Sequence, residues 1–349
     1  MVISGSVFTP GAALMLSRKT AVLAIAAALC LSLPASSMAA SGKSADSTPV
    51  ISVAPADRAK VAELLRDAEE ARSRKSYVEA SVLYRKAADL GSAIAYNNLG
   101  ELFESGQGMK RSTQNAEFCY RKAAATGLHE AEYNLARLYD YGVGVRADYS
   151  KAAYWYRKAA DGGFTPAVSM LGVLYSYGRG VKKDLSEAQR LFEKAAAKGD
   201  PAGLFNLGVM YDTGSGVEAD PAKAAELYRR AGDARYSRAL FNLGMLYASG
   251  RGVSLDYKKA MECWKESHEL GFPAAAYNIG ILYLSGKGVG SSKDEAHRWF
   301  ALSCRGGYRD ACSAAGSIGK KEGGRKESAS AGKKDSRKGA AGGKQQSRR

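Results

Sequence analysis

Histidine and cysteine, which most often bind zinc in proteins, are scarce in this chain: three histidines and five cysteines among 349 residues. His129, His268 and His297 have no metal-ligand spacing with one another or with the cysteines. The S-D-N and K-T-G motifs of serine β-lactamases are absent, and the two S-x-x-K matches, at Ser317 and Ser330, lie near the C-terminus. We therefore expect no metal site, no cofactor and no enzymatic activity.

Long apolar runs are missing beyond the N-terminal region, so no later segment predicts a membrane helix. In that region Arg18 and Lys19 precede the apolar run A-V-L-A-I-A-A-A-L-C-L-S-L and the small residues P-A-S-S-M-A-A. This order predicts a secretory signal peptide over residues 1–40, with translation starting at Met15. Cys30 lies inside the apolar run, unlike a lipid-attachment cysteine. We expect a periplasmic or secreted bacterial protein without a lipid anchor.

Aromatic and large aliphatic residues are absent from the C-terminal tail. From Lys320 to Arg349, eleven Lys or Arg stand against three Asp or Glu, which is +8 of the formal net charge of +16. Such a segment cannot bury enough apolar surface to offset its ordering entropy. The composition predicts a disordered basic tail over residues 319–349, and we also expect a disordered linker over residues 41–55.

The chain does contain a strict 36-residue repeat. Steps of 36 residues from Leu99 reach an apolar residue each time: Leu135, Leu171, Leu207, Leu243 and Ile279. Glycine pairs recur with the same step: Gly106/Gly108, Gly142/Gly144, Gly178/Gly180, Gly214/Gly216, Gly250/Gly252 and Gly286/Gly288. The stretch Y-S-Y-G-R-G-V-K-K-D at 175–184 could by itself be a phosphate-binding loop. A turn present in every unit is expected to be structural instead.

Each unit has the pattern of two helices joined by the glycine turn. In the unit at 129–164, the first helix has an apolar stripe at Ala131, Leu135, Ala136 and Tyr139. The second helix has its stripe at Ala152, Trp155, Tyr156 and Ala159. Each second helix ends at a glycine suited to a C-cap, except at Arg235, where we expect a looser turn. Aromatic residues of the second helices are expected to fill the gaps between successive pairs.

Units such as A-E-Y-N-L-A-R-L-Y-D-Y-G-V-G-V-R-A-D-Y-S-K-A-A-Y-W-Y-R-K-A-A-D-G-G resemble the Sel-1-like repeat family, a relative of the tetratricopeptide repeats. The resemblance implies an all-α fold: an α-solenoid of stacked antiparallel helix pairs in a right-handed superhelix, with six 36-residue repeats plus helical caps. We expect a tetratricopeptide-like hairpin over residues 56–91, and six repeats plus a C-terminal capping helix over residues 92–318.

Two cysteines are candidates for a disulfide. Cys304 and Cys312 would lie at the end of one helix and near the start of the next, where an antiparallel hairpin can bring their Cβ atoms together. Their eight-residue separation resembles that in cysteine-rich secreted members of the family. The alternative is two unpaired thiols. Cys119 and Cys263 lie four repeats apart and are expected to be free and buried.

The resemblance also implies a binding site, because the first helices of tetratricopeptide relatives line a concave groove. The corresponding side chains form two rows: Tyr133, Phe205, Phe241 and Tyr277 in one, and Val173, Val209, Met245 and Ile281 in the other. They could anchor a peptide, or they could pack between neighbouring first helices. A third row could grip a peptide backbone, but is expected instead to form hydrogen bonds between repeats: Asn98, Asn134, Asn206, Asn242 and Asn278.

These features predict a monomeric, non-catalytic scaffold or adaptor that binds a partner protein or peptide in its groove. A different hypothesis is a polyanion binder, whose basic tail contacts peptidoglycan, lipopolysaccharide phosphates or nucleic acid. Some secreted relatives have been associated with penicillin binding or β-lactamase activity, which the missing motifs disfavour here.

Overall fold

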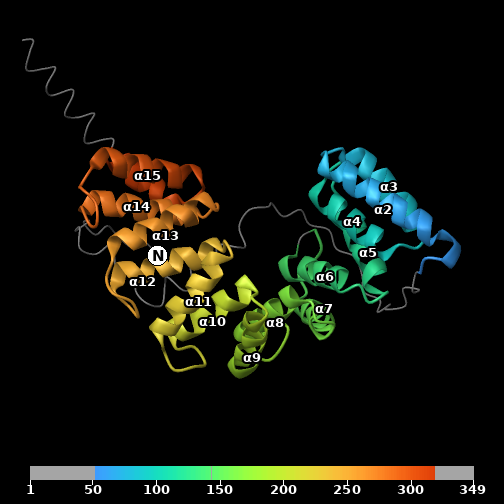
Figure 1. Cartoon of the computed structure of the whole chain (residues 1–349), viewed down its shortest axis with the longest axis horizontal. Helices are drawn as coiled ribbons and strands as arrows, with labels where there is room; N and C mark the ends of the chain where they lie inside the picture. The colour runs from blue at the N-terminus through green and yellow to red at the C-terminus, as the bar shows by residue number, and fades with distance from the viewer. Residues whose placement is uncertain (1–51, 143, 319–349) are drawn as a thin grey trace, which may run out of the picture. The chain divides into compact units, whose positions relative to one another are not determined.

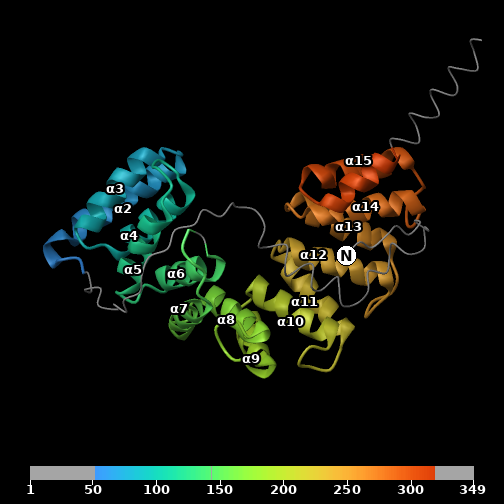
Figure 2. The same cartoon turned by 180° about the vertical axis from the view of Figure 1, so that it is seen from behind.

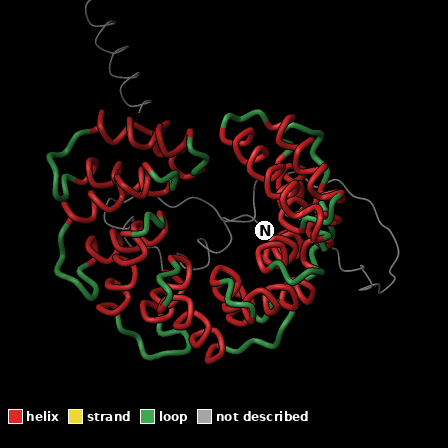
Figure 3. The backbone as a smooth tube through the Cα atoms, turned by 45° about the vertical axis from the view of Figure 1, so that its right-hand side comes forward, coloured by secondary structure: helices red, strands yellow, loops and turns green. Residues whose placement is uncertain are grey.

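The computed structural model describes residues 52–142 and 144–318, in which helices are the only regular secondary structure (Figure 3). The signal peptide, most of the linker and the basic tail lie outside these residues. The chain divides into two compact units, Met1–Asp220 and Pro221–Arg349, which are described separately. No helix in the described part of the chain is long and apolar enough to cross a membrane.

The described residues of unit 1 form a short 3₁₀-helix and nine α-helices (Figures 1 and 2). They are η1 (Pro55–Asp57), α2 (Arg58–Ser73), α3 (Tyr77–Asp89), α4 (Ala93–Ser105), α5 (Thr113–Ala124), α6 (His129–Tyr141), α7 (Tyr149–Asp161), α8 (Thr165–Tyr177), α9 (Leu185–Ala197) and α10 (Pro201–Thr213). Unit 2 contains α11 (Pro221–Asp233), α12 (Ser237–Ser249), α13 (Tyr257–Glu269), α14 (Pro273–Ser285) and α15 (Lys293–Arg305), followed by helical residues 309–318.

Within each unit, every helix packs against the helices that precede and follow it in the sequence. The even-numbered helices α4 to α14 are the first helices of the repeats, and the odd-numbered helices α5 to α15 are the second helices. The predicted all-α solenoid of stacked helix pairs is therefore confirmed. The hairpin ahead of the repeats is formed by α2 and α3.

Local signals set the ends of these helices. Most second helices begin after an Asp or Ser whose side chain accepts a backbone N–H, as Asp148 does from Lys151 at 2.9 Å. Each first helix ends at the first glycine of the pair, which takes a left-handed conformation; Gly178 has φ 69°. Both signals recur with the repeat, so the helix boundaries recur with it.

The second glycine of each pair explains why the turn is invariant. Gly180 has φ 68°, and a Cβ atom there would overlap the carbonyl group of Tyr149, at the start of α7 in the preceding repeat. The equivalent glycines also lie against the start of the preceding second helix: Gly108, Gly144, Gly216, Gly252 and Gly288. The glycine turn is therefore a joint between repeats, as the 36-residue period predicts.

The core of each repeat is built around one large side chain of the second helix. These side chains are almost completely buried: Tyr120, Tyr156, Phe192, Tyr228, Trp264 and Phe300. The glycine of the first helix lies directly against the ring, so a Cβ atom on Gly172 would fall 2.6 Å from the Phe192 ring. This contact explains why most first helices have glycine there. It packs the ring against the first helix of its own repeat, whereas the sequence predicted that the ring fills the gap between successive pairs.

Arg235 keeps the turn that glycine makes in the other repeats. Its φ is 60°, and the backbone N–H of Tyr236 donates to the Ala231 carbonyl oxygen at 3.0 Å, as Phe164 does to Ala159 at 2.9 Å. The expectation of a looser turn was wrong, because the hydrogen bonds hold arginine in a conformation that costs about 1–2 kcal/mol for a residue with a Cβ atom.

We expect Arg235→Gly to stabilise unit 2 by about 0.5–1 kcal/mol, since the relief of this strain exceeds the extra chain entropy of glycine in the unfolded state. Thermal unfolding followed by circular dichroism measures the change. Arg235→Ala, which keeps a Cβ atom, is the matched control and should show no gain. An unchanged melting temperature for the glycine variant would contradict the prediction.

Candidate functional site

The ninth residues of the first helices, taken unit by unit, form what we call the first-helix face. In unit 1 the row is Glu101, Arg137, Val173 and Val209, and in unit 2 it is Met245 and Ile281. All six side chains are half-buried, so each keeps surface that a partner could contact. Four of them belong to the predicted groove, and two charged residues extend the same row toward the N-terminus.

The N-terminal end of the face is charged and held by ion pairs. Arg72 Nη2 in α2 lies 3.0 Å from Glu101 Oε2, and Arg137 Nη2 lies 2.7 Å from Glu104 Oε2 in the preceding first helix. Burial raises the pKa of Glu101, while Arg72 opposes that rise. Sequence analysis missed these residues. The 36-residue spacing could have found them, because Glu101 and Arg137 are in phase with Val173.

The C-terminal part of the face in unit 1 is apolar. Val173 in α8 and Val209 in α10 are half-buried at the position that carries charge in α4 and α6. The same holds within unit 2, where Met245 and Ile281 are half-buried on α12 and α14. Because the fold accepts Glu101 and Arg137 at this position, apolar residues there are not required for packing.

The predicted aromatic row is packed inside each repeat. The Tyr133 ring lies 5.7 Å from Tyr156 and 5.3 Å from Phe164, at the junction with the next repeat. Phe241 lies 5.0 Å from Phe272 by ring centroids. These contacts join the first helix to the end of its own repeat. The packing alternative had supposed contacts between neighbouring first helices instead.

The remaining two residues of this row follow the same arrangement. Tyr277 packs between Phe300 and Tyr308, with ring centroids 5.2 and 5.3 Å apart, and Phe205 is buried, with 6% of its surface exposed. Tyr133, Phe241 and Tyr277 are half-buried. Packing within the repeat thus occupies part of each of these three rings, and burial hides Phe205 from a partner.

One repeat replaces the aromatic pair by a hydrogen bond. Ser169 and Asp200 stand where Tyr133 and Phe164 stand one repeat earlier. Ser169 Oγ donates to Asp200 Oδ2 at 2.5 Å, and the same carboxylate oxygen accepts the backbone N–H of Gly203 at 2.7 Å. The two polar side chains satisfy each other and cap α10, so the junction is kept without rings.

The asparagine row forms bonds to the preceding helix pair at three positions. Asn98 Nδ2 donates to Glu69 Oε1 at 3.0 Å, Asn134 Nδ2 to Asn97 Oδ1 at 3.0 Å, and Asn278 Nδ2 lies 3.3 Å from Met245 Sδ. Asn206 instead donates to the Ala202 carbonyl oxygen in its own helix at 2.9 Å. The first three contacts support the predicted structural role of this row.

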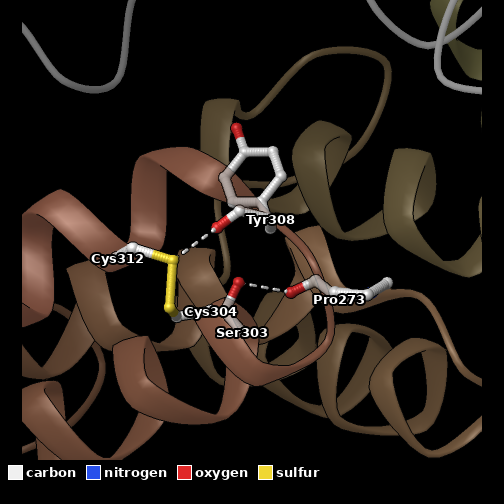
Figure 4. Close-up of a disulfide and its surroundings, with 5 residues drawn as sticks. All are labelled: Pro273, Ser303, Cys304, Tyr308 and Cys312. Carbon is white, nitrogen blue, oxygen red and sulfur yellow. Dashed lines mark hydrogen bonds between the residues drawn. A yellow bond between two sulfur atoms is a disulfide. The ribbon is translucent and has the colours of Figure 1, made fainter. Parts of the chain in front are cut away.

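At the end of unit 2, the structure joins Cys304 and Cys312 as a disulfide (Figure 4). Their Cα atoms are 4.7 Å apart, and the bond links the end of α15 to the helical residues 309–318. Beside it, Ser303 Oγ donates to the Pro273 carbonyl oxygen at 2.8 Å, which ties α15 to the start of α14. The bond therefore lies where it would fasten the last helical segment to the final repeat.

The other two cysteines in the described residues, Cys119 and Cys263, are free thiols; Cys119 is buried as predicted, whereas Cys263 is half-buried. Burial raises the pKa of Cys119 to about 12 and that of Cys263 to about 11, so both are protonated and poorly nucleophilic at neutral pH. Within residues 52–142 and 144–318, no three His, Cys, Asp or Glu side chains are grouped as a metal site.

The turn at 178–184 borders a shallow open pocket of about 550 Å³, lined by Tyr175, Lys182, Lys183, Asp184 and Leu185. This turn lacks the open helix N-terminus of a phosphate-binding loop, because the start of α9 is already capped: Asp184 Oδ1 accepts the backbone N–H of Glu187 at 2.9 Å. That carboxylate places negative charge where a phosphate would bind.

These features define a class of protein, a helical repeat array without a catalytic constellation in its described residues. A family model for the Sel1 repeat matches residues 73–92, 93–128, 129–164, 165–200, 201–236, 237–272 and 273–308. The chain belongs to the Sel1 repeat family. The six full repeats were predicted from the sequence, and the family match adds a partial one over residues 73–92, which include all of α3.

Solved structures agree with this assignment. A Sel1 repeat protein from Oxalobacter formigenes is 32% identical, with a TM-score of 0.65, over 69% of this chain and 99% of that protein. A protective antigen present in uropathogenic Escherichia coli strains, which has an SLR fold, is 29% identical, with a TM-score of 0.57, over 75% of this chain and 57% of the antigen. No curated protein sequence is similar enough to the chain to match it.

Sel1 repeat proteins are generally scaffolds for protein–protein interaction and are typically non-catalytic. The repeat array therefore indicates protein partners for this chain.

Proposed function

We propose that this protein is an exported, non-catalytic scaffold that binds a partner protein through the first-helix face. The observation that carries the proposal is the change from charge to apolar side chains along one repeat position. Glu101 and Arg137 hold that position in two first helices, whereas Val173, Val209, Met245 and Ile281 hold it in the next four. Half-exposed apolar side chains that the fold does not require are typical of a surface that a partner covers.

Export is the second part of the proposal. The N-terminal pattern of Arg18, Lys19, an apolar run and small residues supports a signal peptide, and a disulfide suits an oxidising compartment. Bacterial Sel1 repeat proteins are often extracytoplasmic. The similar antigen of uropathogenic Escherichia coli is consistent with a role at the cell envelope or in contact with a host.

N-terminal sequencing of the exported protein should find a start near Ala40 or Ser41.

The test uses a partner isolated from the cell envelope with the chain lacking residues 319–349. We expect Ile281→Glu to lower the affinity for that partner at least tenfold, or about 1.4 kcal/mol, by placing a carboxylate in an apolar contact. Stability should change by less than about 1 kcal/mol, because residue 281 is only half-buried and a carboxylate there can reach solvent. Isothermal titration calorimetry and thermal unfolding measure the two quantities.

A comparison variant separates binding from packing. Phe241→Ser should reduce stability by more than Ile281→Glu does, because the Phe241 ring packs on Phe272. If Ile281→Glu left the affinity per folded molecule unchanged, the first-helix face would not be the binding surface.

The alternative function, polyanion binding through residues 319–349, rests on the +8 charge of that segment. Removing the tail would then abolish binding to anionic polymers, and that binding would weaken steeply with salt. Binding through the first-helix face would survive both changes.

A further inference from the structure

Three helices of unit 1, α3, α5 and α7, expose apolar side chains at one repeat position. Val82 in α3, Phe118 in α5 and Tyr154 in α7 are each the sixth residue of their helix, with 48%, 56% and 47% of their surfaces exposed. Val78, one turn before Val82, is exposed as well. Because the helices are related by the repeat, the three side chains point to the same side of successive helices.

A lysine follows each of these residues four positions later, one turn along the same side of the helix. These are Lys86, Lys122 and Lys158, and with Val82, Phe118 and Tyr154 they form what we call the apolar–lysine row. The Lys122 Nζ atom lies 5.7 Å from the Phe118 ring centroid, and Lys158 Nζ lies 5.8 Å from that of Tyr154. The ammonium groups rest over the aromatic rings, with the charge at the surface.

The fold does not require apolar residues at this position. The four later second helices carry charged, exposed side chains there: Arg190, Glu226, Glu262 and Arg298. A position that accepts either sign of charge in four helices is a solvent-facing position. The apolar side chains in α3, α5 and α7 therefore need an explanation outside the packing of the repeats.

We propose that the apolar–lysine row is a second docking surface, separate from the first-helix face, for a protein segment that carries apolar side chains flanked by carboxylates. Charge complementarity identifies the partner's chemistry. Among the residues that the structure describes, neither Lys86 nor Lys122 forms an ion pair, whereas Lys158 Nζ lies 3.7 Å from Glu132. Two ammonium groups beside exposed apolar surface are thus available to pair with acidic side chains.

The surface fits a protein segment better than an anionic membrane. Glu79, Asp89 and Asp161 are exposed on the same helices, and their charges would be repelled by anionic lipids. The apolar residues lie in the middle of helix flanks, where a bound segment can lie across them. Repeated anchors one helix pair apart match the way that a partner chain contacts successive repeats.

The first experiment identifies the occupant. A photo-crosslinking amino acid at position 118 of the full chain, expressed in its native host, should crosslink to peptides rich in Asp or Glu and apolar residues, as read by mass spectrometry. The matched control is the same amino acid at position 190, which is equivalent in the repeat and should not give that product. Crosslinking to lipid, no crosslink, or equal crosslinking at both positions would overturn the proposal.

The second experiment measures the interaction with the crosslinked peptide made synthetically. We expect Phe118→Arg, which copies the residue that the chain has at 190 and 298, to weaken binding at least tenfold with an unchanged circular dichroism spectrum. Lys122→Glu should weaken it similarly, and a peptide with lysines in place of its carboxylates should then bind better. Arg190→Ala, at the equivalent exposed position of α9, should have no effect. Unchanged affinity in folded Phe118→Arg would refute the proposal, as would binding to phosphatidylglycerol–phosphatidylethanolamine vesicles that Phe118→Arg abolishes.

Discussion

Gly180→Ala is expected to destabilise unit 1 by about 3 kcal/mol, measured by urea unfolding. Two costs add at this position. The φ of 68° costs about 1–2 kcal/mol for alanine, and the added Cβ atom would overlap the backbone carbonyl of Tyr149 and lie 2.6 Å from the Ser150 nitrogen. Backbone atoms cannot rotate away as a side chain can, so one repeat must shift against the other, at a cost of about 1–3 kcal/mol.

Gly199→Ala separates these two costs. Gly199 has φ 76°, but a Cβ atom there would have no neighbour within 4 Å, so only the backbone strain applies and the loss should be about 1 kcal/mol. Equal losses for the two variants would contradict the close contact between repeats. Lys182→Ala with Lys183→Ala should leave stability unchanged, since a structural turn does not need its lysines.

Replacing Cys304 and Cys312 by serine is expected to destabilise unit 2 by about 2–3 kcal/mol, the scale for opening a short closed loop. The bond joins the end of α15 to residues 309–318, which cover the last repeat, so its loss should free that segment first. A reducing agent should reproduce the shift in the unaltered protein. Cys263→Ser, which removes a free thiol, is the control and should have a much smaller effect.

Alkylation gives an independent measurement of the same bond. In protein isolated without a reducing agent, Cys304 and Cys312 should resist alkylation until they are reduced. Cys119 should react only after unfolding, because burial protects it and raises its pKa to about 12. If both Cys304 and Cys312 were alkylated in the native, unreduced protein, the disulfide prediction would fail.

The sequence was sufficient for features that recur with the 36-residue period. The period determines where glycine turns, buried rings such as Tyr156 and the asparagine row must lie, because each is repeated in phase. Contacts that occur once are different. The ion pair of Arg72 with Glu101 depends on how the N-terminal hairpin packs against the first repeat, which no periodic pattern reports.

In the candidate binding site, too, the sequence predicted the repeated positions but not the individual contacts. The sequence could place Phe241 and Met245 on one first helix, but not decide how far each is buried, since that depends on Phe272 at the end of the repeat. The substitution of Ser169 and Asp200 for an aromatic pair could be understood only once the two positions were known to touch.

The joint made by the glycine turn bears on how the array can change length during evolution. Gly144 lies against Thr113, and Gly180 lies against Tyr149, so each joint uses the same two positions of adjacent repeats. If residues 129–164 were lost, Gly180 would meet Thr113 in place of Tyr149, and no joint would be left without its counterpart. Gain or loss of whole 36-residue segments thus preserves the contact between each glycine and the preceding second helix. Gain or loss of part of a repeat would disrupt one of these contacts. Gene duplication can therefore lengthen the array without redesigning its junctions.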